Sequence, residues 1–145
     1  MEIIKYDKFS QPNERELNSL IDFLHVQLEN FGDERADIMK CANYALSISD
    51  EHGGFILNGR VDGKTVGVVI VNRTGMDGYI PENILVYIAT HRDIRGKGFG
   101  KKLMIKAIEN CEGSIALHVE HDNPARFLYK KIGFTNKYLE MRLNR

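Results

Sequence analysis

Three glycines separated by single residues form the stretch of this sequence with the clearest capacity for chemistry. Gly96, Gly98 and Gly100 alternate with Lys97 and Phe99, and they follow the apolar run from residue 84 to residue 90. Glycine lets a backbone approach a ligand closely, and the first-turn N–H groups of a following helix point toward negative charge. The stretch therefore predicts a strand, a glycine loop and a helix that together bind a phosphate-bearing ligand.

Two familiar phosphate loops do not fit this stretch. A mononucleotide P-loop needs Gly-Lys followed by Ser or Thr, whereas in this stretch Lys97 is followed by Gly98 and Lys101 by another lysine. A dinucleotide loop needs G-x-G-x-x-G, whereas the glycines here recur every second residue. A different family of phosphate-bearing ligands is therefore expected.

The run from Arg95 to Gly100 resembles motif A of the GNAT superfamily of acyl-CoA-dependent N-acyltransferases, whose pattern is Q/R-x-x-G-x-G/A. Downstream, the run from Asp122 to Phe134 (DNPARFLYKKIGF) resembles the family's motif B at the usual distance. The pair is far more specific than motif A alone. The resemblance covers roughly residues 65–134, while the first third of the chain matches only in the order of its elements.

The resemblance implies an α/β (α+β) fold in one GNAT domain that spans residues 1–145. That fold is a mixed, twisted sheet of six to seven strands, with about four helices on both faces and a V-shaped splay between the central strands. The length of 145 residues suits one domain.

Hydrophobic spacing and turn residues predict matching elements along the chain. Asn13 is expected to open one helix and Asp33 to cap a second through its side chain. The apolar central strand is expected to be buried on both faces. The remaining predictions are strands at 2–6, 55–61, 65–72 and 115–119, a tight turn at Asp62-Gly63, a helix opened by Asn123 and Pro124 and closed by Gly133, and return strands from Phe134 that end with Tyr138, Leu139, Met141 and Leu143.

The resemblance also implies which residues hold acetyl-CoA and which acts on it. Asn123 is expected to contact the pantetheine region or to cap its helix, and Tyr129 is expected to donate a proton to the departing thiolate. Counter-charge for the pyrophosphate is expected from Arg95, Lys97 and Lys101. Backbone contacts are expected to the pantetheine arm from Ile88, Ala89 and Thr90, and to the pyrophosphate from Arg95, Gly96, Lys97, Gly98, Phe99, Gly100 and Lys101.

The general base stays open among several groups. Glu82 lies thirteen residues before Arg95, the spacing at which the histone-acetylating branch of the family carries its base glutamate. We therefore predict that Glu82 deprotonates the ammonium group, through water. His118 and Glu120 share one face of the 115–119 strand, and either is an alternative.

The predicted reaction is the transfer of acetyl from acetyl-CoA to a primary amine by direct attack in a ternary complex. A small-molecule acceptor is favoured over a protein, although the sequence does not name it. Phe31, Arg35 and Tyr44 lie in the segment that forms the acceptor wall in the family. The alternatives are a non-catalytic acyl-CoA-binding or sensing domain and a protein or peptide N-acetyltransferase.

Composition limits the partners and the compartment. Twenty basic and twenty acidic side chains give no net charge, so neither nucleic acid nor a membrane is an expected partner. No signal-peptide pattern or membrane-spanning run is present, which predicts a cytoplasmic protein. Cys41 and Cys111 are interpreted as buried free thiols, and no metal site is expected. Members of the family often form homodimers, which makes a homodimer one expectation here.

Overall fold

A mixed five-stranded sheet runs through the computed structural model, which describes residues 1–47 and 52–145. Its strands lie in the order β1 (Glu2–Tyr6), β2 (Gly54–Val61), β3 (Lys64–Arg73), β4 (Asn83–Thr90) and β5 (Ile115–Ala116). The first four pair antiparallel, and β5 runs parallel to β4. The predicted fold class is confirmed, although the sheet has five strands instead of six to seven.

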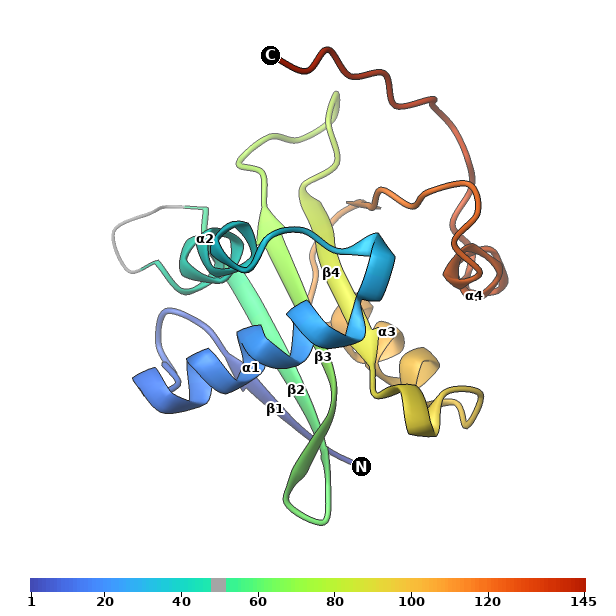
Figure 1. Ribbon diagram of the computed structural model, residues 1–145. Helices are drawn as coiled ribbons and strands as arrows, with labels where there is room; N and C mark the ends of the chain where they lie inside the picture. Colours follow the sequence, from blue (N-terminus) through green and yellow to red (C-terminus); the bar gives the residue numbers. More distant parts are fainter. Residues whose placement is uncertain (48–51) are drawn as a thin grey trace.

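The part of the chain that the structure describes has four α-helices, which cover the two faces of this sheet. They are α1 (Glu14–Gln27), α2 (Arg35–Leu46), α3 (Phe99–Glu109) and α4 (Ala125–Ile132), with short 3-10 turns at η1 (Glu29–Phe31) and η2 (Arg92–Ile94). Figure 1 shows α1 in front of the strands and α3 behind them. Buried side chains form one core cluster under α1 and α2 and a second under α3 and α4, so the sheet separates two apolar layers.

Local signals in the sequence account for most of these elements. Asn13 caps α1, because its side chain accepts a hydrogen bond from the Glu16 N–H. Asp62 and Gly63 take φ values of 50° and 76°, as the predicted tight turn between β2 and β3 requires. Gly133 ends α4 with a φ of 123°. Each of these predictions is confirmed.

The start of α2 differs from the prediction. Glu34, not Asp33, is the N-cap residue of α2, and no side chain of the described residues caps it. The Asp33 carboxylate instead accepts a hydrogen bond from the Tyr87 hydroxyl. The predicted capping role of Asp33 is therefore wrong, because a partner on the central strand competes for its side chain.

A bulge bends β4 and ends its pairing with β5. Opposite β3, Ile70 pairs with Tyr87 while Val71 pairs with Leu85, which leaves Val86 as an extra residue. On the other side, β5 pairs with β4 only at Asn83 and Ile84. The two strands therefore separate beyond Ile84, and the predicted strand at 115–119 shortens to Ile115–Ala116. Residues of β4 alternate between buried and half-buried, so the strand is less enclosed than the predicted burial on both faces.

The last residues of the chain do not join the sheet. The described residues 135–145 contain no strand and are exposed, in contrast to the predicted return strands. Figure 1 shows this segment running away from α4 along the periphery. A two-residue β5 offers little edge on which a further strand could pair, which gives a physical reason for the difference.

Candidate functional site

The glycine loop presents an open, electropositive helix end. Gly96 and Gly98 have φ values of 83° and 84°, and no atom would lie within 4 Å of a Cβ at either position. Gly98 is the N-cap of α3, whose first backbone hydrogen bond runs from Lys102 N to Gly98 O at 3.1 Å. The N–H groups of the three residues between them thus have no acceptor within the helix, and the first turn contains no acidic residue. This arrangement suits an anion.

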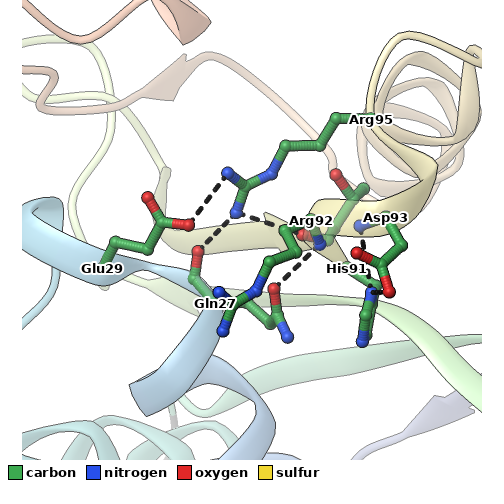
Figure 2. Close-up of polar contacts among 7 residues, drawn as sticks. Gln27, Glu29, His91, Arg92, Asp93 and Arg95 are labelled. Atoms are coloured by element: carbon green, nitrogen blue, oxygen red, sulfur yellow. Dashed lines mark hydrogen bonds and ion pairs between the residues drawn. The ribbon is translucent and has the colours of Figure 1, made fainter.

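Arg95 anchors the loop to the end of α1 (Figure 2). Its guanidinium donates to the Gln27 carbonyl at 2.7 Å and lies 3.2 Å from the Glu29 carboxylate. A longer contact of 3.4 Å reaches the Thr90 carbonyl. The guanidinium predicted as counter-charge is therefore occupied by protein partners. Lys97 and Lys101 are exposed and supply the free positive charge beside the loop.

Gln27 is a residue of this region that the sequence reasoning missed. Its side chain is 7% exposed, and its Oε1 accepts a hydrogen bond from Arg92 N at 2.9 Å. Figure 2 shows Gln27 at the end of α1, in contact with Arg92 and Arg95. The sequence signal that could have identified Gln27 was its place as a polar residue in the last turn of the helix, on the face that is otherwise apolar.

The separation of β4 from β5 leaves a backbone edge open toward the glycine loop. His91 N donates to Val66 O, and the paired residues alternate along antiparallel strands, so the main-chain groups of Ala89 point to β3. Those of Ile88 and Thr90 point the other way, past the end of β5. Two of the three residues predicted to contact pantetheine thus have the required orientation, and Ala89 does not.

Tyr129 lies in the core cluster beneath α3, with 8% of its surface exposed. Its ring meets Phe134 edge-on at 6.1 Å between centroids. Burial raises the pKa of the Tyr129 phenol to about 12. The hydroxyl therefore keeps its proton across the neutral range and is available as a donor.

Motif A and motif B meet where β4 ends. A Cβ on Gly100 would lie 3.6 Å from Leu128 of α4 and 3.8 Å from Thr90 of β4. The N-cap residue of α4 is Pro124, one residue after the predicted Asn123, although the Asn123 Oδ1 accepts the Ala125 N–H at 2.9 Å. The structure thus brings together the glycine loop, the open strand edge and the helix that carries Tyr129.

Glu82 lies apart from this group, before the start of β4 and at the opposite end of the strand from the loop. Its Oε2 accepts the Ser114 N–H at 2.6 Å. Its own backbone N–H, and those of Ser114 and Gly78, lower the pKa of the Glu82 carboxyl. A hydrogen-bonded carboxylate with a lowered pKa is a weak base, and these contacts favour a role in holding β5 beside β4.

The structure also shows where the alternative bases and the residues predicted to line the acceptor wall lie. His118 and Glu120 are exposed in the segment that follows β5. Arg35 bonds Asp22 and Asn18 of α1, at 2.6 and 2.8 Å, and Tyr44 donates to the Arg73 carbonyl at 2.7 Å. On the predicted acceptor wall, Phe31 is the third candidate, with 37% of its surface exposed.

Burial raises the pKa of the Cys41 thiol to about 12 and that of Cys111 to about 11. Both thiols are therefore protonated at neutral pH and poorly nucleophilic. Within residues 1–47 and 52–145, no group of three His, Cys, Asp or Glu side chains is placed to hold a metal ion. None of the helices described is long and apolar enough to cross a membrane.

The sequence profile described as "Acetyltransferase (GNAT) family" matches residues 16–134, which is most of the chain. The chain belongs to the GNAT acetyltransferase family. No curated protein matches the sequence significantly. The match to the family profile confirms the predicted superfamily.

Solved GNAT structures share the fold at low sequence identity. An aminoglycoside 6′-N-acetyltransferase, AAC(6′)-IG from Acinetobacter haemolyticus, superposes with a TM-score of 0.70 at 14% identity, over 100% of this chain and 98% of that one. A ribosomal-protein-alanine N-acetyltransferase from Brucella melitensis biovar Abortus 2308 gives 0.65 at 21% identity, over 100% of both chains. The aminoglycoside N-acetyltransferase AAC(6′)-Iy, solved in complex with CoA, gives 0.66 at 16% identity, over 99% and 98%. At these identities the likeness establishes the fold, and the acceptor is a separate question.

Proposed function

We propose that this GNAT protein transfers acetyl from acetyl-CoA to the primary amine of a small-molecule acceptor, by direct attack in a ternary complex. The observation that carries the proposal is the open end of α3. Gly96 and Gly98 leave free space there, and the unpaired edge of β4 leads into it.

In this proposal the pyrophosphate of the coenzyme binds the free N–H groups of Phe99, Gly100 and Lys101. A helix N-terminus contributes about 0.3–2 kcal/mol toward a nearby negative charge, before individual hydrogen bonds are counted. Lys97 and Lys101 add charge from exposed positions. Arg95 contributes indirectly, because it holds the loop against Gln27 and Glu29.

The pantetheine arm then lies along β4 as an additional strand. Ile88 and Thr90 offer main-chain groups to it, while Ala89 only maintains the strand through its pairing with β3. Asn123 holds the first turn of α4, and in this proposal it also contacts the pantetheine region. A backbone N–H on this edge is also suited to polarise the thioester carbonyl.

The chemical step joins the amine nitrogen to the carbonyl carbon and breaks the carbon–sulfur bond. Tyr129 donates its hydroxyl proton to the leaving sulfur, and its phenolate regains a proton, through water, from the nitrogen as the amide forms. A phenol that stays protonated at neutral pH suits this cycle. The ammonium group loses its proton to water. His118 and Glu120 are the exposed side chains open to relay it, and the hydrogen bonds of Glu82 leave it the less suitable base.

Thiol release tests this function. Purified protein is mixed with acetyl-CoA and, in turn, spermidine, kanamycin, L-lysine and a short peptide, and free CoA thiol is followed. We expect amine-dependent release with at least one small amine. Release with the peptide alone would instead favour a peptide acceptor. CoA binding without release from any amine would contradict the proposal in favour of a sensing domain.

A further inference from the structure

A hydrogen bond ties the connection between α1 and α2 to the middle of the central strand. The Tyr87 hydroxyl donates to Asp33 Oδ2 at 2.5 Å, across a sequence separation of 54 residues. Tyr87 is 8% exposed, whereas Asp33 is exposed. One carboxylate oxygen of Asp33 is therefore held by a fixed donor, and no described residue bonds the other.

This bond places Asp33 above the strand that receives the thioester in the proposed function. Tyr87 follows the bulge at Val86, and the next residue, Ile88, directs its main-chain groups to the open edge. Figure 1 shows the connection from α1 to α2 crossing in front of β4. The Asp33 carboxylate is thus linked to the backbone of β4 through the side chain of Tyr87.

Among the residues that the structure describes, no Lys, Arg or His forms a salt bridge with Asp33. Arg35, two residues along the chain, pairs instead with Asp22 at 2.6 Å. The other titratable groups that act on Tyr87 are Cys41 and Asp37, and the Cys41 thiol is neutral at physiological pH. The Asp33 carboxylate is therefore an exposed negative charge next to the buried Tyr87, which favours a positively charged ligand.

We propose that Asp33 binds the ammonium group of the acceptor and that Tyr87 is its positioning residue. The inference rests on the proposed function and adds to it the residue that orients the amine. The Asp33 carboxylate accepts a hydrogen bond from the ammonium, and its bond from Tyr87 fixes the direction of that interaction. Deprotonation then follows by loss of a proton to water, with no transfer to Asp33.

Three variants separate charge, position and general surface effects. Asp33→Asn retains an acceptor for Tyr87 but removes the charge, and Tyr87→Phe removes the positioning hydroxyl while retaining the ring. Glu34→Gln is the matched control, because Glu34 is the neighbouring exposed carboxylate and caps α2 without a side-chain bond. KM and kcat are measured for acetyl-CoA and for the amine that the wild-type protein uses, at low and high salt. CoA affinity and thermal unfolding verify that each variant is folded.

For Asp33→Asn we expect KM for the amine to rise about 10- to 100-fold, as for a lost hydrogen bond to a charged group. The salt dependence of that KM should disappear, because the exposed charge that salt screens is gone. For Tyr87→Phe we expect a rise of about 3- to 10-fold, with the salt dependence retained. CoA affinity should be unchanged in both variants, and Glu34→Gln should match the wild type.

Two results would overturn the inference in distinguishable ways. If Asp33→Asn keeps the wild-type KM for an amine that the wild-type protein acetylates, Asp33 does not bind the ammonium and the proposed function stands. If the wild-type protein binds CoA but acetylates no amine, the proposed function and this inference both fail.

Discussion

The environment of each side chain determines its protonation state and therefore the role that it can take in the reaction. Burial keeps the Tyr129 phenol protonated, with its pKa raised to about 12, whereas backbone N–H groups keep Glu82 ionised. Burial and the neighbouring Asp33 likewise raise the pKa of Tyr87 and keep it a donor. Tyr129 is therefore well suited to donate a proton to the leaving sulfur. Glu82 is poorly suited to act as the general base.

Replacement of Tyr129 by Phe tests the proposed proton donor. We expect kcat to fall about 100-fold or more, as for the loss of a general acid, while KM for acetyl-CoA changes little. Because the raised pKa keeps Tyr129 protonated below about 12, its ionisation should cause no loss of wild-type kcat between pH 7 and 10. Steady-state kinetics across this range provide the measurement.

Tyr138→Phe is the control for this variant, since Tyr138 is 79% exposed in the C-terminal segment and its substitution should leave kcat unchanged. An unaltered kcat in Tyr129→Phe would show that the leaving thiolate needs no proton from this residue.

Glu82 is expected to matter for stability more than for catalysis. Glu82→Ala removes the acceptor of the Ser114 N–H, so Tm should fall, while Glu82→Gln keeps an acceptor and should lose less. Neither variant should alter the pH dependence of kcat/KM. A basic limb of that profile that disappears in Glu82→Gln would restore Glu82 as the base.

Among the secondary-structure elements, β4 and its bulge carry the proposed coenzyme site. The extra residue Val86 shifts the strand out of register with β3, and pairing with β5 stops at Ile84. The open edge of Ile88 and Thr90 then leads to the glycine loop and to the N-terminus of α3. Arg95 ties this loop to Gln27 at the end of α1 and to Glu29 in the connection between α1 and α2.

Gly98→Ala tests the glycine loop, with Gly78→Ala as a matched control. Both glycines have left-handed φ values, 84° and 77°, and both face open space. An alanine should therefore destabilise the protein by about 1–2 kcal/mol at either position, through backbone strain alone. Only Gly98→Ala should also weaken CoA binding, about tenfold or more, because its methyl group enters the phosphate path. Calorimetric titration with CoA checks this, and equal CoA affinity in the two variants would place the phosphates elsewhere.

The sequence predicted elements well where a local signal decides them. The Asn13 cap, the Asp62-Gly63 turn and the glycine-rich start of α3 each depend on residues close in the chain, and all three appear in the structure. The bond between Asp33 and Tyr87 was missed, because its partners lie 54 residues apart and capping was the nearer use of an aspartate. Gln27 and Arg95 were missed as partners for the same reason.

In the whole molecule the sheet separates two helical layers, which the proposed function assigns to the coenzyme and to the acceptor. α3 and α4 pack on one face and present the glycine loop and Tyr129, while α1 and α2 pack on the other and present Asp33. The C-terminal segment belongs to neither layer. Its apolar side chains at Leu139, Met141 and Leu143 are 80–91% exposed, although their spacing predicted a strand.

Removal of residues 137–145 tests this placement of the C-terminus. Exposed segments contribute little to stability, so Tm should change by no more than about 2 °C. Phe134→Ala is the comparison, because Phe134 contacts Tyr129 in the core and its loss should lower Tm clearly. Thermal unfolding of both proteins gives the answer. A large loss in the truncated protein would show that the segment packs on the sheet as the predicted return strand.

Amide chemical shifts measured during titration with CoA would show whether the β4 edge and the N-terminus of α3 bind the coenzyme, as we propose. We predict that the largest changes occur at the backbone N–H groups of Ile88, Thr90 and residues 96–101, with little change at Ala89, which points to β3. Changes concentrated instead around the 640 Å³ pocket that Lys5, Arg73 and Glu82 line, at the other end of β4, would contradict the account.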